Sequence, residues 1–160
     1  MSTRIDRYLT QFRAANDAMI ELVAACDDEG WQRQSTSEGW TVAAVAHHVA
    51  VRYGVVAEMF SCLIDAGADI LQMSPEELHA ENASHAQEYA TVGRSETLDL
   101  LHNNGDLFVR SLQRIDSDAF LDHTAEIFNG NELSVAYLIQ DVVIGHCVNH
   151  ADSIRATIAG

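Results

Sequence analysis

Apolar residues recur along most of this chain at intervals of three and four, the spacing that places side chains on one face of an α-helix. The first such segment runs from about Ile5 to Cys26, and Gly30 is placed to end it in the left-handed conformation. Few segments alternate apolar and polar residues as a half-buried strand does. The pattern therefore predicts an all-α protein.

Four more helices are expected after a loop from Trp31 to Gly39. Each begins at a side chain that can accept hydrogen bonds from free backbone N–H groups. These expected starts are Thr41 for a long helix ending near residues 66–67, Ser74 before Pro75 for a short helix to about Tyr89, Ser95 for a helix through Ile115, and Ser134 for a last helix from Val135 to about Ile158. Each long helix has one apolar stripe to bury, so we expect a four-helix bundle with one short extra helix.

Composition narrows the class of protein. A chain of 160 residues with 48% apolar residues is expected to form one domain over residues 1–160. Asp and Glu number 24 against 9 basic residues, a net charge of −15, which disfavours binding to nucleic acid or to a membrane surface. All basic residues are arginine, which excludes Schiff-base chemistry and a Walker-type phosphate loop.

Signals of export are missing from the sequence. No apolar run reaches the roughly 18 residues of a membrane span, and no N-terminal signal segment is apparent. Cys26, Cys62 and Cys147 are an odd number of widely spaced thiols, which supports neither a disulfide framework nor a thiolate zinc site. We therefore expect a soluble cytoplasmic protein with reduced cysteines.

The last predicted helix carries His146 and His150, four residues apart. Side chains at this spacing project from the same helix face, so the two imidazoles can bind one cation. On a regular helical wheel both fall in the middle of an apolar stripe, where an unpaired polar group costs about 1–3 kcal/mol. The residues alone leave two interpretations open: a metal site, or two core histidines hydrogen-bonded to facing groups.

The second predicted helix offers two adjacent histidines. His48 lies at the edge of its apolar stripe, on a flank shared with Arg52, and is the better candidate for an inward ligand. His47 lies nearly opposite the stripe and is expected at the surface. The remaining histidines have no partner at ligand spacing and are expected at the surface or in caps: His79, His85, His102 and His123.

Other residues near the histidines have ordinary structural explanations. Cys147 points about 100° away from His146 on the wheel, which favours packing over a nucleophilic role. Trp40 is also expected to pack, although a place in a cleft wall is the alternative. Asp141 and Asp152 are expected on a solvated helix face.

Two segments resemble the motifs of one family. Gly39-Trp40-Thr41-Val42 followed by His48 resembles the first motif of the DinB/YfiT-like metalloenzyme superfamily, and the segment from His146 to Ile154 resembles its second motif. The resemblance covers essentially the whole chain. It implies a four-helix bundle, usually a homodimer, in which His48, His146 and His150 hold one divalent metal ion, commonly zinc or nickel.

The resemblance also suggests a chemistry. Three neutral imidazoles leave the metal charge uncancelled and one position open, as in catalytic sites. Several relatives use a low-molecular-weight thiol, which favours thiol transfer to a small-molecule electrophile. Metal-dependent hydrolysis and a non-catalytic metal- or ligand-binding stress-response module are the alternatives. The mycothiol-dependent maleylpyruvate isomerase branch tends to have Glu at the position of His146 and a further C-terminal domain, so that isomerase activity is not expected.

Overall fold

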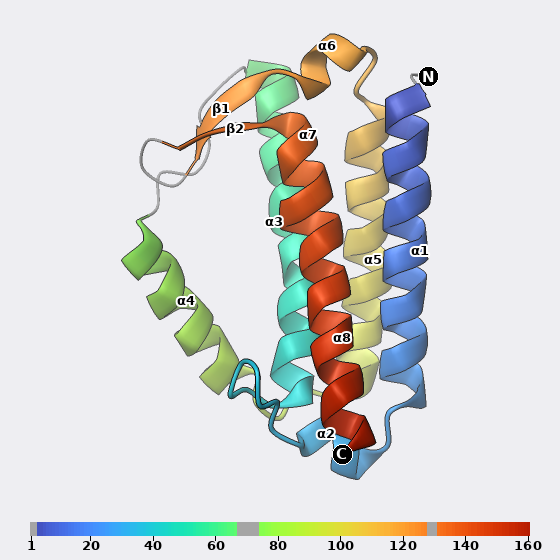
Figure 1. Ribbon diagram of the computed structural model, residues 1–160, viewed down its shortest axis with the longest axis vertical. Coiled ribbons are helices and arrows are strands. Elements are labelled where there is room, and N and C mark those ends of the chain that lie inside the picture. The colour runs from blue at the N-terminus through green and yellow to red at the C-terminus, as the bar shows by residue number, and fades with distance from the viewer. Residues whose placement is uncertain (1–2, 67–73, 128–130) are drawn as a thin grey trace.

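Four long helices pack side by side along the length of the molecule (Figure 1). The computed structural model describes residues 3–66, 74–127 and 131–160. The long elements are α1 (Thr3–Ala25), α3 (Val42–Ala66), α5 (Arg94–Gln113) and a C-terminal helix composed of α7 (Val135–Tyr137), the π-helical segment η1 (Leu138–Gly145) and α8 (His146–Ala159). Both α1 and α3 contact α5 and α8, so the four helices enclose one core. The predicted four-helix bundle is confirmed.

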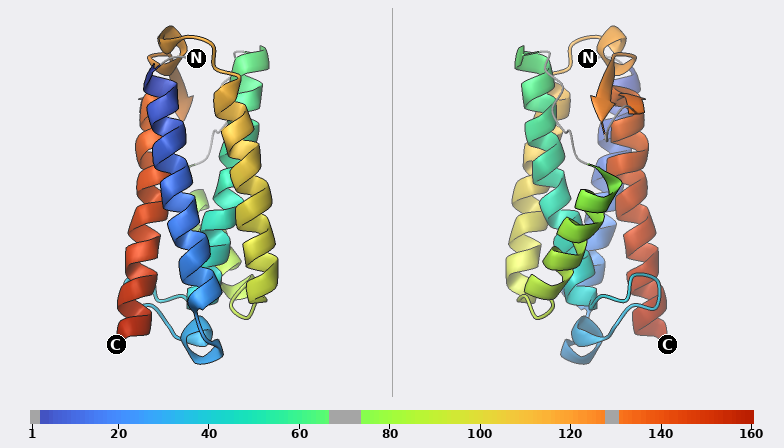
Figure 2. Two further views of the ribbon diagram at one scale, coloured as in Figure 1. Left: turned by 90° about the vertical axis from the view of Figure 1, so that its right-hand side faces the viewer. Right: turned by 90° about the vertical axis from the view of Figure 1, so that its left-hand side faces the viewer.

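The chain direction explains the extra helix. In Figure 1, α1 and the C-terminal helix run downward, whereas α3 and α5 both run upward. Because α3 and α5 are parallel neighbours, the chain must cross back between them, and α4 (Pro75–Glu88) makes this crossing outside the bundle (Figure 2). None of the residues of α4 is fully buried, yet it covers the first half of α3.

Aromatic side chains from three helices form the centre of the core. Phe12 of α1 contacts Tyr53 of α3 and Phe108 of α5, with ring centroids 5.0 and 4.6 Å apart. Every residue from 42 to 50 is buried, so this part of α3 is covered on all sides. The beginning of α3 is therefore where polar side chains can be held away from water.

Three of the predicted helix starts are confirmed. Thr41 Oγ1 accepts from the N–H of Ala44, Ser134 Oγ accepts from Tyr137, and Ser74 forms a reciprocal capping box with Glu77. The prediction for Ser95 was wrong, because α5 begins at Arg94 with Gly93 as its cap. The prediction for Gly30 was also wrong.

Gly30 lies inside a short helix, α2 (Asp28–Gln32), rather than at the end of α1. Its ideal Cβ would lie 3.3 Å from the Ile158 side chain, so this glycine permits close packing and not a left-handed turn. A four-residue helix, α6 (Asp118–Leu121), was likewise not predicted. Both helices are too short to show a periodic apolar pattern.

A small β-hairpin, which was not predicted, lies between α6 and the C-terminal helix in the chain. Strands β1 (Thr124–Ile127) and β2 (Asn131–Ser134) pair antiparallel, with Thr124 opposite Ser134. Each has four residues, which is too few for alternation to stand out against the helical pattern. Within the described ranges, no helix is long and apolar enough to cross a membrane.

The π-helical segment changes the buried face of the C-terminal helix. Its wider turn gives each residue less rotation than the regular wheel assumes. The fully buried positions of this helix are Val135, Leu138, Ile139, Val143, Ile144, Cys147, Ala151 and Ile154. His146 and His150 lie beside this stripe rather than in its middle, and both are mostly but not fully buried.

Gly105 of α5 permits a close approach to α1. A Cβ at this position would lie 2.6 Å from Asn16 Nδ2, which donates to the carbonyl oxygen of Leu101. Asn16 Oδ1 is buried and has no hydrogen-bond partner among the described residues. We predict that Gly105→Ala lowers the free energy of unfolding by about 1–2 kcal/mol, because overpacking outweighs the helix propensity of alanine. Urea denaturation measures the loss. In an Asn16→Ala background the same change should stabilise the protein, and destabilisation in both backgrounds would contradict this explanation.

Candidate metal centre

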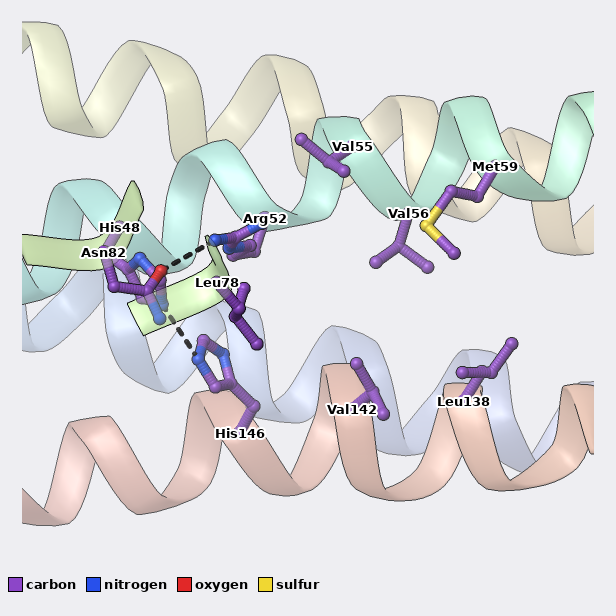
Figure 3. A pocket seen from close by; sticks show the side chains of 10 residues that line it. All are labelled: His48, Arg52, Val55, Val56, Met59, Leu78, Asn82, Leu138, Val142 and His146. Atoms are coloured by element: carbon purple, nitrogen blue, oxygen red, sulfur yellow. Dashed lines mark hydrogen bonds between the residues drawn. The ribbon is translucent and has the colours of Figure 1, made fainter. Parts of the chain in front are cut away.

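Three imidazole rings from two helices converge at one point. His48 comes from α3, and His146 and His150 come from successive turns of α8. The Nε2 atom of His146 lies 3.1 Å from Nε2 of His48 and 3.1 Å from Nε2 of His150. Figure 3 shows the His48 and His146 rings facing each other across the space between their helices. The structure thus brings together the three histidines predicted as ligands.

The geometry suits a tetrahedral cation. With metal–nitrogen bonds of 2.0–2.1 Å, two ligands of a tetrahedral zinc ion are about 3.3 Å apart. The two 3.1 Å separations are close to this value, and ligand atoms of all three histidines lie within 4.8 Å of one another. The three-histidine group could therefore hold a metal ion, and its donor set suits zinc or nickel among other ions.

The environment keeps two of the rings neutral. Burial, together with the other histidines and Arg52, lowers the pKa of His48 to about 2. Burial, His150 and Arg52 lower the pKa of His146 to about 3. At neutral pH both rings therefore retain a nitrogen lone pair, which is the form that binds a metal ion.

A carboxylate holds the third ring. Glu38 Oε1 lies 2.9 Å from His150 Nδ1, and both side chains are more than four-fifths buried. Burial of Glu38 favours its neutral form, but hydrogen bonds from Ser153, Ser35 and His150 outweigh this effect and lower its pKa. An ionised Glu38 accepts from Nδ1–H, which orients the His150 ring with Nε2 facing the other two rings.

The loop before α3 positions Glu38. Ser35 N–H donates to the carbonyl oxygen of Trp40 at 2.8 Å, and Val42 N–H donates to that of Arg33 at 3.0 Å. Gly39 closes the loop with a φ of 72°, a conformation that glycine adopts without strain. Glu38 was missed by sequence reasoning because it lies in a loop 112 positions from His150, a separation with no spacing signal.

A pocket of about 210 Å³ lies beside the three histidines. It runs between α3 and the C-terminal helix, and α4 covers part of it (Figure 3). The lining residues are His48, Arg52, Val55, Val56, Met59, Leu78, Asn82, Leu138, Val142 and His146. A small molecule in this pocket would contact two of the three candidate ligands.

His47 and His85 do not occupy the surface positions predicted for them. His47 is 2% exposed, and its Nδ1 lies 3.2 Å from Nε2 of the half-buried His85. The His47 ring also stacks on Tyr89 at a centroid distance of 3.9 Å. The helical wheel correctly predicted that His47 points away from the bundle. It could not show that α4 packs over that outer side of α3. Burial lowers the pKa of both rings, in His85 to about 4 with help from His47.

The other predictions near the site agree with the structure. Cys147 is buried and accepts from Tyr53 OH at 2.9 Å, and burial raises its thiol pKa to about 11. Asp141 is exposed, and the exposed Asp152 pairs with Arg155. Trp40 packs against the core and also meets the His48 ring edge to face at 5.5 Å.

Comparison with known families gives a match over most of the chain. Residues 12–148 match the family described as the mycothiol maleylpyruvate isomerase N-terminal domain. The chain belongs to this family. The histidine at position 146 therefore does not place the chain outside the family. None of the curated proteins matches at a significant level.

Three solved structures share the fold. YfiT from Bacillus subtilis, a probable metal-dependent hydrolase with an unusual four-helix bundle topology, is 16% identical with a TM-score of 0.77, over 99% of this chain and 90% of YfiT. The mycothiol-dependent maleylpyruvate isomerase is 19% identical with a TM-score of 0.72, over 96% of this chain. A mutant of that isomerase is 16% identical with a TM-score of 0.75. The family member described here spans only 63% of the length of either isomerase chain.

Glu38→Gln tests the hydrogen bond that orients His150. We predict that it weakens metal binding about 10- to 100-fold, because the ring loses the carboxylate that holds Nδ1–H. Competition with a chromophoric chelator measures the affinity. Glu29→Gln is the matched control, since it removes one carboxylate from an exposed ion pair with Arg33. Equal affinities of both variants would contradict the assigned role of Glu38.

Acid should destabilise the metal-free fold through His48 and His146. Between about pH 6.5 and 4.5 the unfolded chain binds protons that the two folded rings, with pKa values of about 2 and 3, do not. Stability therefore rises with pH across this window and is lost as pH falls. Removing one group in His146→Gln should reduce the slope by up to about 1.4 kcal/mol per pH unit, measured by urea unfolding in chelator. An unchanged slope would show that folded His146 does take up a proton.

Proposed function

We propose that this protein is a metal-dependent enzyme in which His48, His146 and His150 bind one divalent cation, zinc or nickel, and that it transfers a low-molecular-weight thiol to a small electrophile. The observation that carries the proposal is the convergence of three Nε2 atoms beside an apolar pocket. Three protein ligands leave a coordination position for another molecule, whereas structural zinc sites use four. When bound, such a cation supplies Lewis acidity that favours the ionised form of a thiol or of water.

The pocket walls favour a thiol over water as the nucleophile. Among the described residues that line the cavity, none carries a carboxyl or hydroxyl group. These walls therefore supply no carboxylate base to take a proton from water and no acid to protonate a leaving group. A thiol ionises at far lower cost and needs less assistance. The mycothiol dependence of the solved isomerases supports the same choice.

Metal-dependent hydrolysis is the second candidate. It is supported by the likeness to YfiT, a probable metal-dependent hydrolase. This likeness covers nearly all of both chains. The two functions differ in one requirement, because hydrolysis proceeds without an added thiol. If the protein only binds a metal or ligand, no turnover is expected with or without an added thiol.

Metal content tests the first half of the proposal. Protein purified without a nickel column should contain about one zinc or nickel ion per chain by elemental analysis, and His146→Gln should contain far less. The control is His102→Gln, an exposed histidine of α5, which should keep the metal. Absence of metal from the purified protein, combined with failure of the chelated protein to take up zinc or nickel, would overturn the assigned site.

Thiol dependence tests the second half. Mycothiol, bacillithiol, glutathione and coenzyme A are each supplied with a chromogenic electrophile, and metal-loaded protein should accelerate conjugation with at least one of them. His146→Gln should lose at least about 100-fold in rate, because the site no longer has three ligands. Ester or amide hydrolysis without any thiol would favour the second candidate.

Sedimentation of the same sample tests the predicted homodimer.

A further inference from the structure

One cationic side chain lines the pocket beside the histidines. Arg52 lies one helical turn after His48 on α3, so both side chains project from the same face. Figure 3 shows His48 and His146 toward one end of the cavity, Met59 and Leu138 toward the other, and Arg52 between them. The other described residues that line the pocket are mainly aliphatic. A ligand with an apolar body would therefore need a charged group at the position that faces the guanidinium.

The hydrogen bonds of Arg52 leave donors available. Nη2 donates to Asn82 Oδ1 of α4 at 2.7 Å, and no hydrogen bond of Nε or Nη1 to the described residues is found. Glu81 Oε2 lies 3.8 Å from Nη2, but its side chain is 54% exposed, against 22% for Arg52. An exposed ion pair at this distance compensates the charge only weakly. Asn82 therefore orients the guanidinium, while its other N–H groups make no hydrogen bond within the described part of the chain.

We propose that Arg52 binds the carboxylate of the substrate and so determines its specificity. This inference rests on the proposed function, since it names the substrate class of the same pocket. The substrate would be an acid with its carboxylate near the reacting end, beside the histidines, and an aliphatic tail directed toward Met59 and Leu138. The planar guanidinium has parallel N–H donors that match the two oxygens of a carboxylate.

Charge also favours an acid over a neutral ligand. The Arg52 side chain is 22% exposed and faces an apolar pocket, so an anion that pairs with it gains a charge-assisted hydrogen bond that a neutral molecule of the same shape does not. Arg52 is a specificity-determining residue in this scheme, because it contacts the carboxylate and not the reacting atoms.

Binding of a simple acid tests the assignment without any turnover. Hexanoate and its neutral isostere hexanamide are titrated into chelated and metal-loaded protein, followed by NMR chemical shifts. Arg52→Gln should weaken hexanoate binding by about tenfold or more in both forms and change hexanamide binding less than about twofold. Arg52→Lys, which keeps the charge but not the fork, should retain part of the affinity. The matched control is Arg13→Gln, which removes an exposed arginine of α1.

The outcomes separate this proposal from the function on which it rests. Hexanoate binding that is indifferent to Arg52→Gln, or that requires the metal alone, would overturn the role of Arg52 while leaving the metal site in place. Equal weakening of hexanoate and hexanamide would show that Arg52 only tethers α4 through Asn82. Conversely, Arg52-dependent binding in chelated protein would stand even if the metal and thiol experiments failed.

Discussion

Neutral imidazole nitrogens brought together away from water are the constraint on which the rest of the site depends. Two rings have depressed pKa values, the Nδ1 atom of the third lies against Glu38, and the Nε2 atoms of all three are directed at one space. Lone pairs at 3.1 Å repel one another unless a proton or a cation lies between them. A divalent cation satisfies all three nitrogens at once, which hydrogen bonds among the three rings do not.

The bundle keeps these imidazoles away from water by covering both sides of α3. The inner side faces α8 and carries His48, whereas the outer side carries His47 beneath α4. Because α3 and α5 are parallel, the crossover helix α4 must pass over the bundle, and its path places Leu78 and Asn82 in the pocket wall. The topology that closes the fold therefore also forms one wall of the site.

The family relationship identifies the type of domain but not the reaction. Residues 12–148 match a domain of an isomerase whose solved chains are longer than this one, and the sequence identities are low enough that the likeness shows fold alone. Position 146 illustrates the difference between fold and chemistry. A histidine here would complete a set of neutral ligands that leaves the full charge of a bound metal ion available, whereas a carboxylate would cancel part of it.

Local sequence patterns determined the long helices, the short helix α4, three of the helix caps and the pairing of His146 with His150. Helical periodicity and capping act between residues a few positions apart, so they can be read directly from the chain. The same periodicity predicted that His48 points inward, and the family motif predicted that it acts together with His146 and His150. Tertiary structure decided the burial of His47 under α4, the contact of Glu38 with His150 and the place of Arg52 in the pocket. These contacts join segments far apart in the chain or depend on which helix covers which face, and such distances leave no periodic trace in the sequence.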